Sequence, residues 1–134
     1  MNNYLLVIPA QYQSSRFPGK PLADIHGKSM LRRVWDKCIQ AASPEKILVA
    51  TDDDRIKGHC QENGMQVEMT SSSCLTGTDR LYEVALKRKS DIYINVQGDE
   101  PLVSPEDIKA VIDASQNEPV ITFNAMCSIK NEDD

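Results

Sequence analysis

The stretch YLLVIPAQYQSSRFPGKPL, residues 4–22, joins an apolar run to an irregular segment that carries two cations, Arg16 and Lys20. The run at 4–10 is short, aliphatic and not alternating in polarity, which is typical of a strand buried on both faces of a parallel sheet. In the segment after it, Gly19 lets the backbone approach a ligand closely. Fixed cations and free N–H groups suit a polyphosphate; an ordinary surface loop with two solvated cations is the alternative.

Further apolar runs of the same kind follow at 46–51, 91–96 and 120–126, and a weaker one lies at 65–69. Between the runs, apolar residues recur at spacings of three and four, which predicts helices. Strand and helix therefore alternate, with short connections. We expect an α/β fold with a Rossmann-like, mostly parallel sheet and helices on both faces.

The expected helices have recognisable ends. Ser29 is a candidate N-cap for a helix at 29–43, and Gly64 is a stop signal for a helix at 52–64. Ser104 and Pro105 have the residue types of an N-cap and a first helical position. The residues expected to face inward are Met30, Leu31, Val34, Trp35, Cys38 and Ile39, then Leu81, Val84 and Ala85, then Ile108, Val111 and Ile112.

Composition narrows the class of protein. A chain of 134 residues, 40% apolar and 26% charged, is expected to form one globular domain. Its net charge of −5 argues against nucleic acid as a partner. The four cysteines form no CxxC pair and have no histidine at metal-ligand spacing, so we expect no zinc site. The first residues lack the features of a signal peptide or a membrane span, so we expect a cytoplasmic protein with reduced thiols.

Polar segments follow the strands at the edge where doubly wound sheets bind ligands. They are TDDDR at 51–55 and QGDEP at 97–101, together with the cationic segment described above. Gly98 and Pro101 favour a tight turn around Asp99. A carboxylate held near bound phosphates is what Mg²⁺ requires, because the ion usually takes one or two protein carboxylates. The alternative is an ordinary acidic turn.

The segment CLTGTDR at 74–80 supplies another candidate. Thr76, Gly77 and Thr78 lead into a helix, so their hydroxyl and amide groups either cap that helix or hold a ligand. Arg80 either contacts a ligand or lies on the surface of the helix.

Four motifs taken together resemble one family. They are IPAQYQSSRFPGKPL at 8–22, VATDD at 49–53, MTSSSCLTGTDR at 69–80 and NVQGDEP at 95–101. In this order they closely resemble the 3-deoxy-manno-octulosonate (Kdo) cytidylyltransferases, and the resemblance covers residues 4–126. Sialic acid cytidylyltransferases share the opening motif but usually have IP-x-K-N where this chain has FPGKPL.

The resemblance implies a nucleotidyltransferase with the fold of nucleotide-diphospho-sugar transferases. It would transfer CMP from CTP to a keto-sugar acid, Kdo or a close relative, and release pyrophosphate with the help of Mg²⁺. By similarity, Arg16 and Lys20 would bind the triphosphate and Asp99 would hold the metal. With Arg80, the candidates for contact with the nucleotide are Pro9, Ala10, Gln11, Thr76, Gly77 and Thr78, and Gln97 is a candidate for contact with the nucleotide or the sugar.

Two departures from the family pattern matter. Gln11 stands where the family usually has an arginine, and a neutral amide contributes no charge to triphosphate binding. Family members are also much longer. We therefore expect an N-terminal CTP-binding domain at 4–126, with a tail or truncation point at 127–134, from an enzyme that is a homodimer at full length and has no membrane partner.

Two other functions stay open on the sequence alone. One is a sibling enzyme that uses sialic acid or another nonulosonic acid. The other is a non-catalytic, nucleotide-binding remnant of such an enzyme.

Overall fold

The computed structural model describes residues 3–12, 20–71, 77–96, 104–116 and 122–124. Within these ranges, five strands form one sheet in the order β5-β4-β1-β6-β7, and every neighbouring pair is parallel. This confirms the expected Rossmann-like α/β fold. The strands are β1 (Tyr4–Pro9), β4 (Ile47–Thr51), β5 (Val67–Met69), β6 (Ile92–Asn95) and β7 (Thr122–Asn124). The helices are α1 (Met30–Ile39), α2 (Asp54–Glu62), α3 (Gly77–Lys87) and α4 (Pro105–Gln116).

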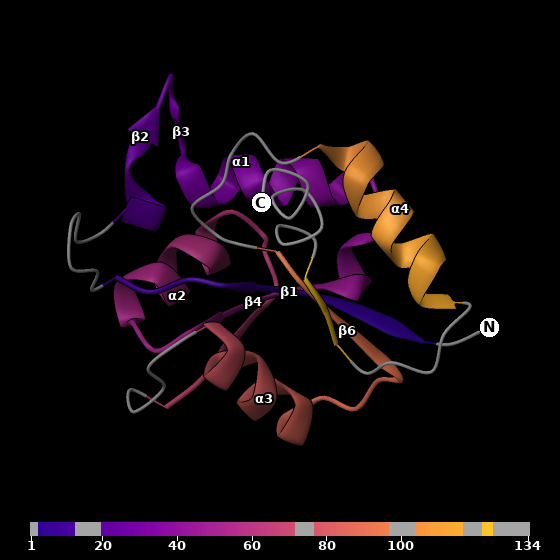
Figure 1. The fold of residues 1–134 in the computed structure, drawn as a ribbon. Coiled ribbons are helices and arrows are strands. Elements are labelled where there is room, and N and C mark those ends of the chain that lie inside the picture. Colours follow the sequence, from indigo (N-terminus) through magenta and orange to yellow (C-terminus); the bar gives the residue numbers. More distant parts are fainter. Residues whose placement is uncertain (1–2, 13–19, 72–76, 97–103, 117–121, 125–134) are drawn as a thin grey trace, which may run out of the picture.

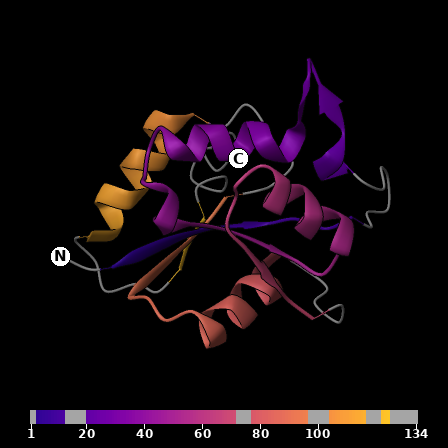
Figure 2. The same cartoon turned by 180° about the vertical axis from the view of Figure 1, so that it is seen from behind.

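Helices cover both faces of the sheet, with α1 and α4 on one side and α3 on the other (Figures 1 and 2). Side chains alternate between the faces along β1: Leu6 and Ile8 pack with α1, α2 and α4, whereas Leu5 and Val7 pack with α3. All residues of β4 and β6 are buried. This two-sided burial explains why these strands have continuous apolar sequences.

The helix α1 follows the predicted pattern with one exception. Ser29 caps it, because its Oγ accepts a hydrogen bond of 3.0 Å from the Arg32 N–H. The side chain of Ile39, expected to face inward, is 40% exposed. With 3.6 residues per turn, Ile39 lies about 100° from the centre of the buried stripe and therefore on its flank.

The ends of the other helices match the sequence signals. Gly64 has φ +69°, the left-handed conformation expected of a residue that ends a helix. Ser104 Oγ accepts hydrogen bonds from the N–H groups of Glu106 at 3.1 Å and Asp107 at 3.4 Å, at the start of α4. In α3, the expected inward face packs against the sheet through Leu81, Val84 and Ala85.

A small hairpin was not foreseen from the sequence. It consists of β2 (Asp24–Ile25) and β3 (Lys28–Ser29), and its turn residues His26 and Gly27 have φ values of 52° and 89°. Two positive φ values are typical of the tight turns that join antiparallel strands. The hairpin projects from the end of the molecule opposite the N-terminus (Figures 1 and 2). The short 3-10 turns η1 (Lys20–Leu22) and η2 (Pro44–Lys46) were also missed.

Two cysteines belong to the core. Cys38 and Cys60 are free thiols that are fully buried, and burial raises the pKa of each to about 12. Within the described ranges, no three His, Cys, Asp or Glu residues gather to hold a metal ion. None of the helices described above is long and apolar enough to cross a membrane.

Candidate functional site

The carboxyl ends of β1 and β6 lie side by side. Val7 is the register partner of Asn95, and the N–H of Val96 donates a hydrogen bond of 2.9 Å to the Val7 carbonyl. Chain connections run outward in opposite directions from these two neighbouring strands, to β4 on one side and to β7 on the other. Such a switch point is where doubly wound sheets bind ligands. The cationic sequence that follows β1 and the acidic sequence QGDEP that follows β6 are therefore attached to neighbouring strand ends.

The first residues after β1 are well placed by the core. Pro9 is the last residue of β1, and Ala10 is buried and donates a hydrogen bond of 2.9 Å from its N–H to the Ala50 carbonyl. Gln11 and Tyr12 are half-buried. Three of the nucleotide candidates, Pro9, Ala10 and Gln11, thus stand at the carboxyl edge beside β4 and β6.

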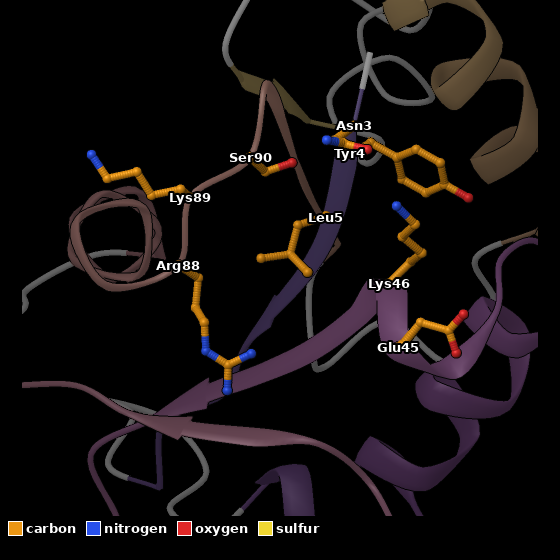
Figure 3. Close-up of a pocket in the computed structure, with 8 residues that line it drawn as sticks. All are labelled: Asn3, Tyr4, Leu5, Glu45, Lys46, Arg88, Lys89 and Ser90. Atoms are coloured by element: carbon orange, nitrogen blue, oxygen red, sulfur yellow. The ribbon is translucent and has the colours of Figure 1, made fainter. Parts of the chain in front are cut away.

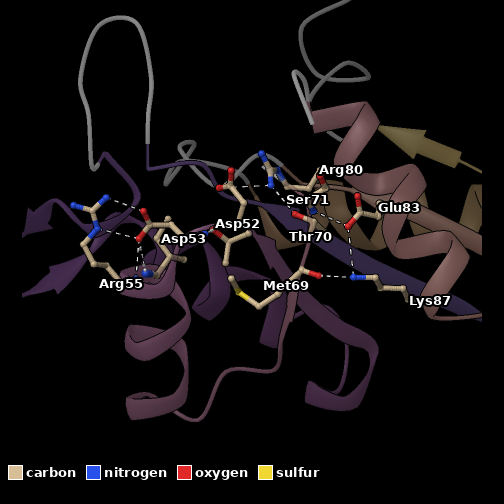
Figure 4. Close-up of polar contacts among 11 residues, drawn as sticks. Asp52, Asp53, Arg55, Met69, Thr70, Ser71, Arg80, Glu83 and Lys87 are labelled. Atoms are coloured by element: carbon tan, nitrogen blue, oxygen red, sulfur yellow. Dashed lines mark hydrogen bonds and ion pairs between the residues drawn. The ribbon is translucent and has the colours of Figure 1, made fainter. Parts of the chain in front are cut away.

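Arg80 lies inside the protein, which rules out the expected alternative of a helix-surface position. Its side chain is fully buried, and its Nη1 lies 2.6 Å from Thr70 Oγ1 and 3.7 Å from Asp52 Oδ1 (Figure 4). Among the described residues, its Nε has no hydrogen-bond partner. Arg80 therefore joins the first turn of α3 to the carboxyl ends of β4 and β5.

Further contacts from α3 hold the chain where it leaves β5. The N–H of Ser71 donates a hydrogen bond of 2.7 Å to Glu83 Oε2, and Lys87 Nζ donates one of 2.8 Å to the Met69 carbonyl (Figure 4). The described chain resumes at Gly77, the first residue of α3. The chain is therefore held at this edge where it leaves β5, at Met69 and Ser71, and it returns to the described structure at the start of α3.

A second guanidinium lies at the start of α2. Asp53 is the N-cap of α2, and its carboxylate also pairs with Arg55 at 2.7 Å (Figure 4). Hydrogen bonding to the Arg55 side chain is the main cause that lowers the pKa of Asp53. The guanidinium carbon of Arg55 lies 3.3 Å from the centroid of the Tyr12 ring, so α2 contacts the segment that leaves β1.

The remaining candidates are described only in part. Lys20 opens η1, and Gly77 and Thr78 begin α3, but the side chains of Lys20 and Thr78 lie outside the described part of the structure. Helix α3 begins at Gly77, so Thr78 lies within the first turn and not at the N-cap. The residues that fall outside the described ranges altogether are Arg16, Thr76, Gln97 and Asp99.

Sequence reasoning gave no individual role to three polar residues of this edge, although all three lie in the motifs quoted above. Asp52 and Thr70 are the partners of Arg80, and Asn95 is buried, with no hydrogen-bond partner for its Oδ1 among the described residues. A polar residue in an otherwise apolar strand could have singled out Asn95. For Arg80 the only signal was the carboxylate after β4, because a buried guanidinium requires an anionic partner.

A pocket of about 360 Å³ lies at the opposite, amino edge of the sheet (Figure 3). Three cationic side chains line it, but Arg88 is paired with Glu68 at 3.1 Å and Lys46 lies 5.2 Å from the centroid of the Tyr4 ring. Ligands of doubly wound sheets bind at the carboxyl edge, so this pocket is not assigned to the candidate site. Its lining residues are Asn3, Tyr4, Leu5, Glu45, Lys46, Arg88, Lys89 and Ser90.

Comparison with known proteins gives consistent matches. The chain is 42% identical over 127 residues to the 3-deoxy-manno-octulosonate cytidylyltransferase of Escherichia coli, which covers 95% of this chain and 52% of that protein. It is 48% identical over 130 residues to the mitochondrial enzyme of the same name from Arabidopsis thaliana, covering 95% and 45%. The chain thus spans about half the length of the curated relatives it matches.

Solved structures agree. A CMP:2-keto-3-deoxy-manno-octonic acid synthetase complexed with CTP is 44% identical and superposes with a TM-score of 0.83, over 88% of this chain and 49% of that one. A cytidylyltransferase from Leptospira borgpetersenii, 23% identical over 84% of this chain and 48% of its own, shares the fold with a TM-score of 0.73. The family model described as "Cytidylyltransferase" matches residues 5–132. The resemblance seen in the four motifs is confirmed, and the chain belongs to the cytidylyltransferase family.

Proposed function

We propose that the chain is the CTP-binding half of an enzyme that transfers CMP from CTP to Kdo. The observation that carries the proposal is the likeness, at 44% identity and a TM-score of 0.83, to a synthetase of CMP-Kdo solved with CTP. The named curated relatives at 42% and 48% identity act on the same sugar acid by name, which favours Kdo over sialic and other nonulosonic acids.

In the proposed reaction, the anomeric hydroxyl of the sugar acid attacks the α-phosphorus of CTP in line with the leaving group. A bond forms between the sugar oxygen and the α-phosphorus, the bond from that phosphorus to the bridging oxygen breaks, and pyrophosphate leaves. The hydroxyl proton is lost to solvent. Catalysis of this kind depends on positioning and on neutralisation of phosphate charge more than on covalent steps by the protein.

Arg16 and Lys20 are the residues we propose for contact with the triphosphate, and Asp99 for Mg²⁺. Two of the carboxylates described at this edge, Asp52 and Asp53, pair with guanidinium groups. A single further carboxylate is compatible with Mg²⁺, because the ion fills its other positions with water and phosphate oxygens. When bound, the ion would withdraw negative charge from the phosphates.

The nucleotide itself is proposed to lie across the exits of β1 and β6. Contacts from the exit of β1 would come from Pro9, Ala10 and Gln11, and a contact from the exit of β6 would come from Gln97. Contacts at the start of α3 would come from Thr76, Gly77 and Thr78. Arg80 stays a candidate through its buried Nε, which is a donor without a partner among the described residues. Gln11 supplies no charge, so we expect weaker triphosphate binding than an arginine at this position would give.

The cellular location and the oligomeric state are part of the same proposal. Free, buried thiols at Cys38 and Cys60 fit the cytoplasmic location that we propose, because cytosolic cysteines are kept reduced. For the longer enzyme we propose a homodimer.

A chimera tests the function. This chain replaces the matching half of the Escherichia coli relative, and pyrophosphate release is measured with CTP, Mg²⁺ and a panel of sugar acids. We expect release with Kdo, and slow or no turnover by the 134-residue chain alone. CTP binding without turnover by the chimera would favour a non-catalytic remnant. A folded chimera that binds no CTP would refute the proposal.

A further inference from the structure

Two sides of the Arg55 guanidinium are fixed by neighbours. One edge of the group pairs with Asp53, through Nε to Oδ1 at 3.1 Å and Nη2 to Oδ2 at 2.7 Å (Figure 4). Its carbon lies 3.3 Å from the centroid of the Tyr12 ring. Asp53 in turn is fixed as the N-cap of α2, because its Oδ1 accepts the Arg55 N–H at 2.8 Å. The first turn of α2 therefore presents a guanidinium, held by the Asp53 carboxylate, to the Tyr12 ring.

Tyr12 is fixed in turn by the core. Its half-buried side chain packs against the larger apolar cluster, which also contains Ala10. The Ala10 N–H is bonded to the Ala50 carbonyl at 2.9 Å. The ring of Tyr12 thus connects the core to Arg55 at the last described residue before the cationic segment.

We infer that Arg55 is a positioning residue for nucleotide binding, and that it acts by holding Tyr12 and so fixing the course of residues 10–12 where the chain leaves β1, among them the nucleotide candidates Ala10 and Gln11. The inference rests on the proposed function. Donors that are aligned before the ligand arrives raise affinity, because less conformational entropy is lost on binding. At an exposed site such as that of Arg55, the contribution of a guanidinium over an aromatic ring corresponds to roughly a 2- to 5-fold change in affinity.

Two other roles for Arg55 make different predictions. As a simple surface ion pair it would have little effect, because exposed pairs contribute little and the Arg55 side chain is 57% exposed. As a direct phosphate ligand it would need only its positive charge. A lysine preserves the charge but has neither the planar group nor the paired N–H donors that contact Tyr12 and Asp53.

The test uses four variants of the whole chain: Arg55→Ala, Arg55→Lys, Tyr12→Leu and the double variant Tyr12→Leu/Arg55→Ala. Amide hydrogen exchange of residues 10–12 is measured without nucleotide, and CTP affinity is measured by calorimetry with Mg²⁺. We expect faster exchange and a roughly 2- to 5-fold loss of affinity in every variant. The double variant should lose no more than either single alanine or leucine variant, because the two residues act through one contact.

Arg88→Ala is the matched control. Like Arg55, Arg88 pairs with a carboxylate, that of Glu68 at 3.1 Å, but Arg88 lies at the amino edge of the sheet. The Arg88→Ala variant should change neither the amide hydrogen exchange of residues 10–12 nor the affinity for CTP.

Unchanged exchange of residues 10–12 in Arg55→Ala would overturn the inference. So would a lysine variant that keeps full CTP affinity while Tyr12→Leu has no effect, since Arg55 would then act by charge alone. If the unmodified chain binds no CTP, the proposed function fails. The exchange rates alone then support or overturn the link between Arg55 and the exit of β1.

Discussion

Arg80 Nη1 donates a hydrogen bond of 2.6 Å to Thr70 Oγ1, although Arg80 belongs to α3 and Thr70 follows β5. The same nitrogen lies 3.7 Å from Asp52 Oδ1, at the end of β4. A helix on one face of the sheet is thereby tied to two strand ends at the edge where the nucleotide is proposed to bind. A buried guanidinium at this point stabilises the edge only while both partners are present.

Replacing Arg80 by methionine should therefore cost more than its single hydrogen bond. The variant leaves the Asp52 carboxylate and the buried Thr70 hydroxyl without their partner. We expect the free energy of unfolding to fall by about 2–3 kcal/mol, below the cost of breaking a fully buried pair because the Asp52 side chain is 24% exposed. Urea denaturation measures the change.

Arg88→Met is the comparison for that experiment. Its ion pair with Glu68 has side chains that are 38% and 25% exposed, so the loss should stay below about 1 kcal/mol. Equal losses for Arg80→Met and Arg88→Met would contradict the role given to the buried contact.

His59 should make stability depend on pH. Its Nε2 lies 2.6 Å from Ser29 Oγ, and Asn63 Nδ2 lies 3.3 Å from its Nδ1, an arrangement that suits the neutral ring. Burial lowers the pKa of His59, and the nearby Arg32 lowers it further, whereas Glu62 acts in the opposite direction.

Because the pKa of His59 is lower in the folded state, the unfolded chain takes up the proton first as pH falls. The stability that this residue contributes is complete above its unfolded value of about 6.5 and is lost as pH falls toward the lower folded pKa. Denaturation midpoints measured from pH 7 down to about pH 5 should thus decline less steeply in His59→Gln than in the parent. Parallel profiles for the two proteins would show that His59 is not the cause.

Cys38 and Cys60 should resist thiol reagents in the folded protein. Both side chains are fully buried, and the pKa of each is raised to about 12, so the reactive thiolate is scarce. In a Cys74→Ser/Cys127→Ser variant, only these two thiols remain. Their modification by a chromogenic disulfide should proceed no faster than global unfolding, and rapid labelling under native conditions would mean that the core opens locally.

The strands and helices could be predicted from sequence because packing on both faces leaves clear patterns. Ser29, Gly64 and Ser104 also mark helix ends by their residue types, and the structure agrees at each. The hairpin was missed because its strands have only two residues each. Its turn also requires a positive φ at His26, a backbone conformation that residues other than glycine seldom adopt.

The shared edge of the strand ends that lead into the site segments could also be predicted, since parallel strands bring their carboxyl ends to one edge. The partners of Arg80 could not. Its contact with Thr70 and Asp52 depends on β5 and β4 being neighbours, and no local spacing in the sequence encodes that order. The contact between Arg55 and Tyr12 was missed for the same reason, because α2 and the exit of β1 are brought together only by the fold.

The strongest effects on catalysis are expected at Lys20 and Asp99. In the chimera, Lys20→Ala and Asp99→Ala should each lower the rate of pyrophosphate release by roughly 100-fold or more, because each removes a charge that would neutralise the phosphates. Neither should change the denaturation midpoint appreciably, since both belong to segments that follow the strands. Lys28→Ala removes a cation of the neighbouring hairpin, paired with Asp36 at 2.9 Å, and should leave the rate unchanged. Near-normal rates in Lys20→Ala or Asp99→Ala would remove that residue from the proposed site, whereas a loss as large in Lys28→Ala would show that general charge, not position, controls the reaction.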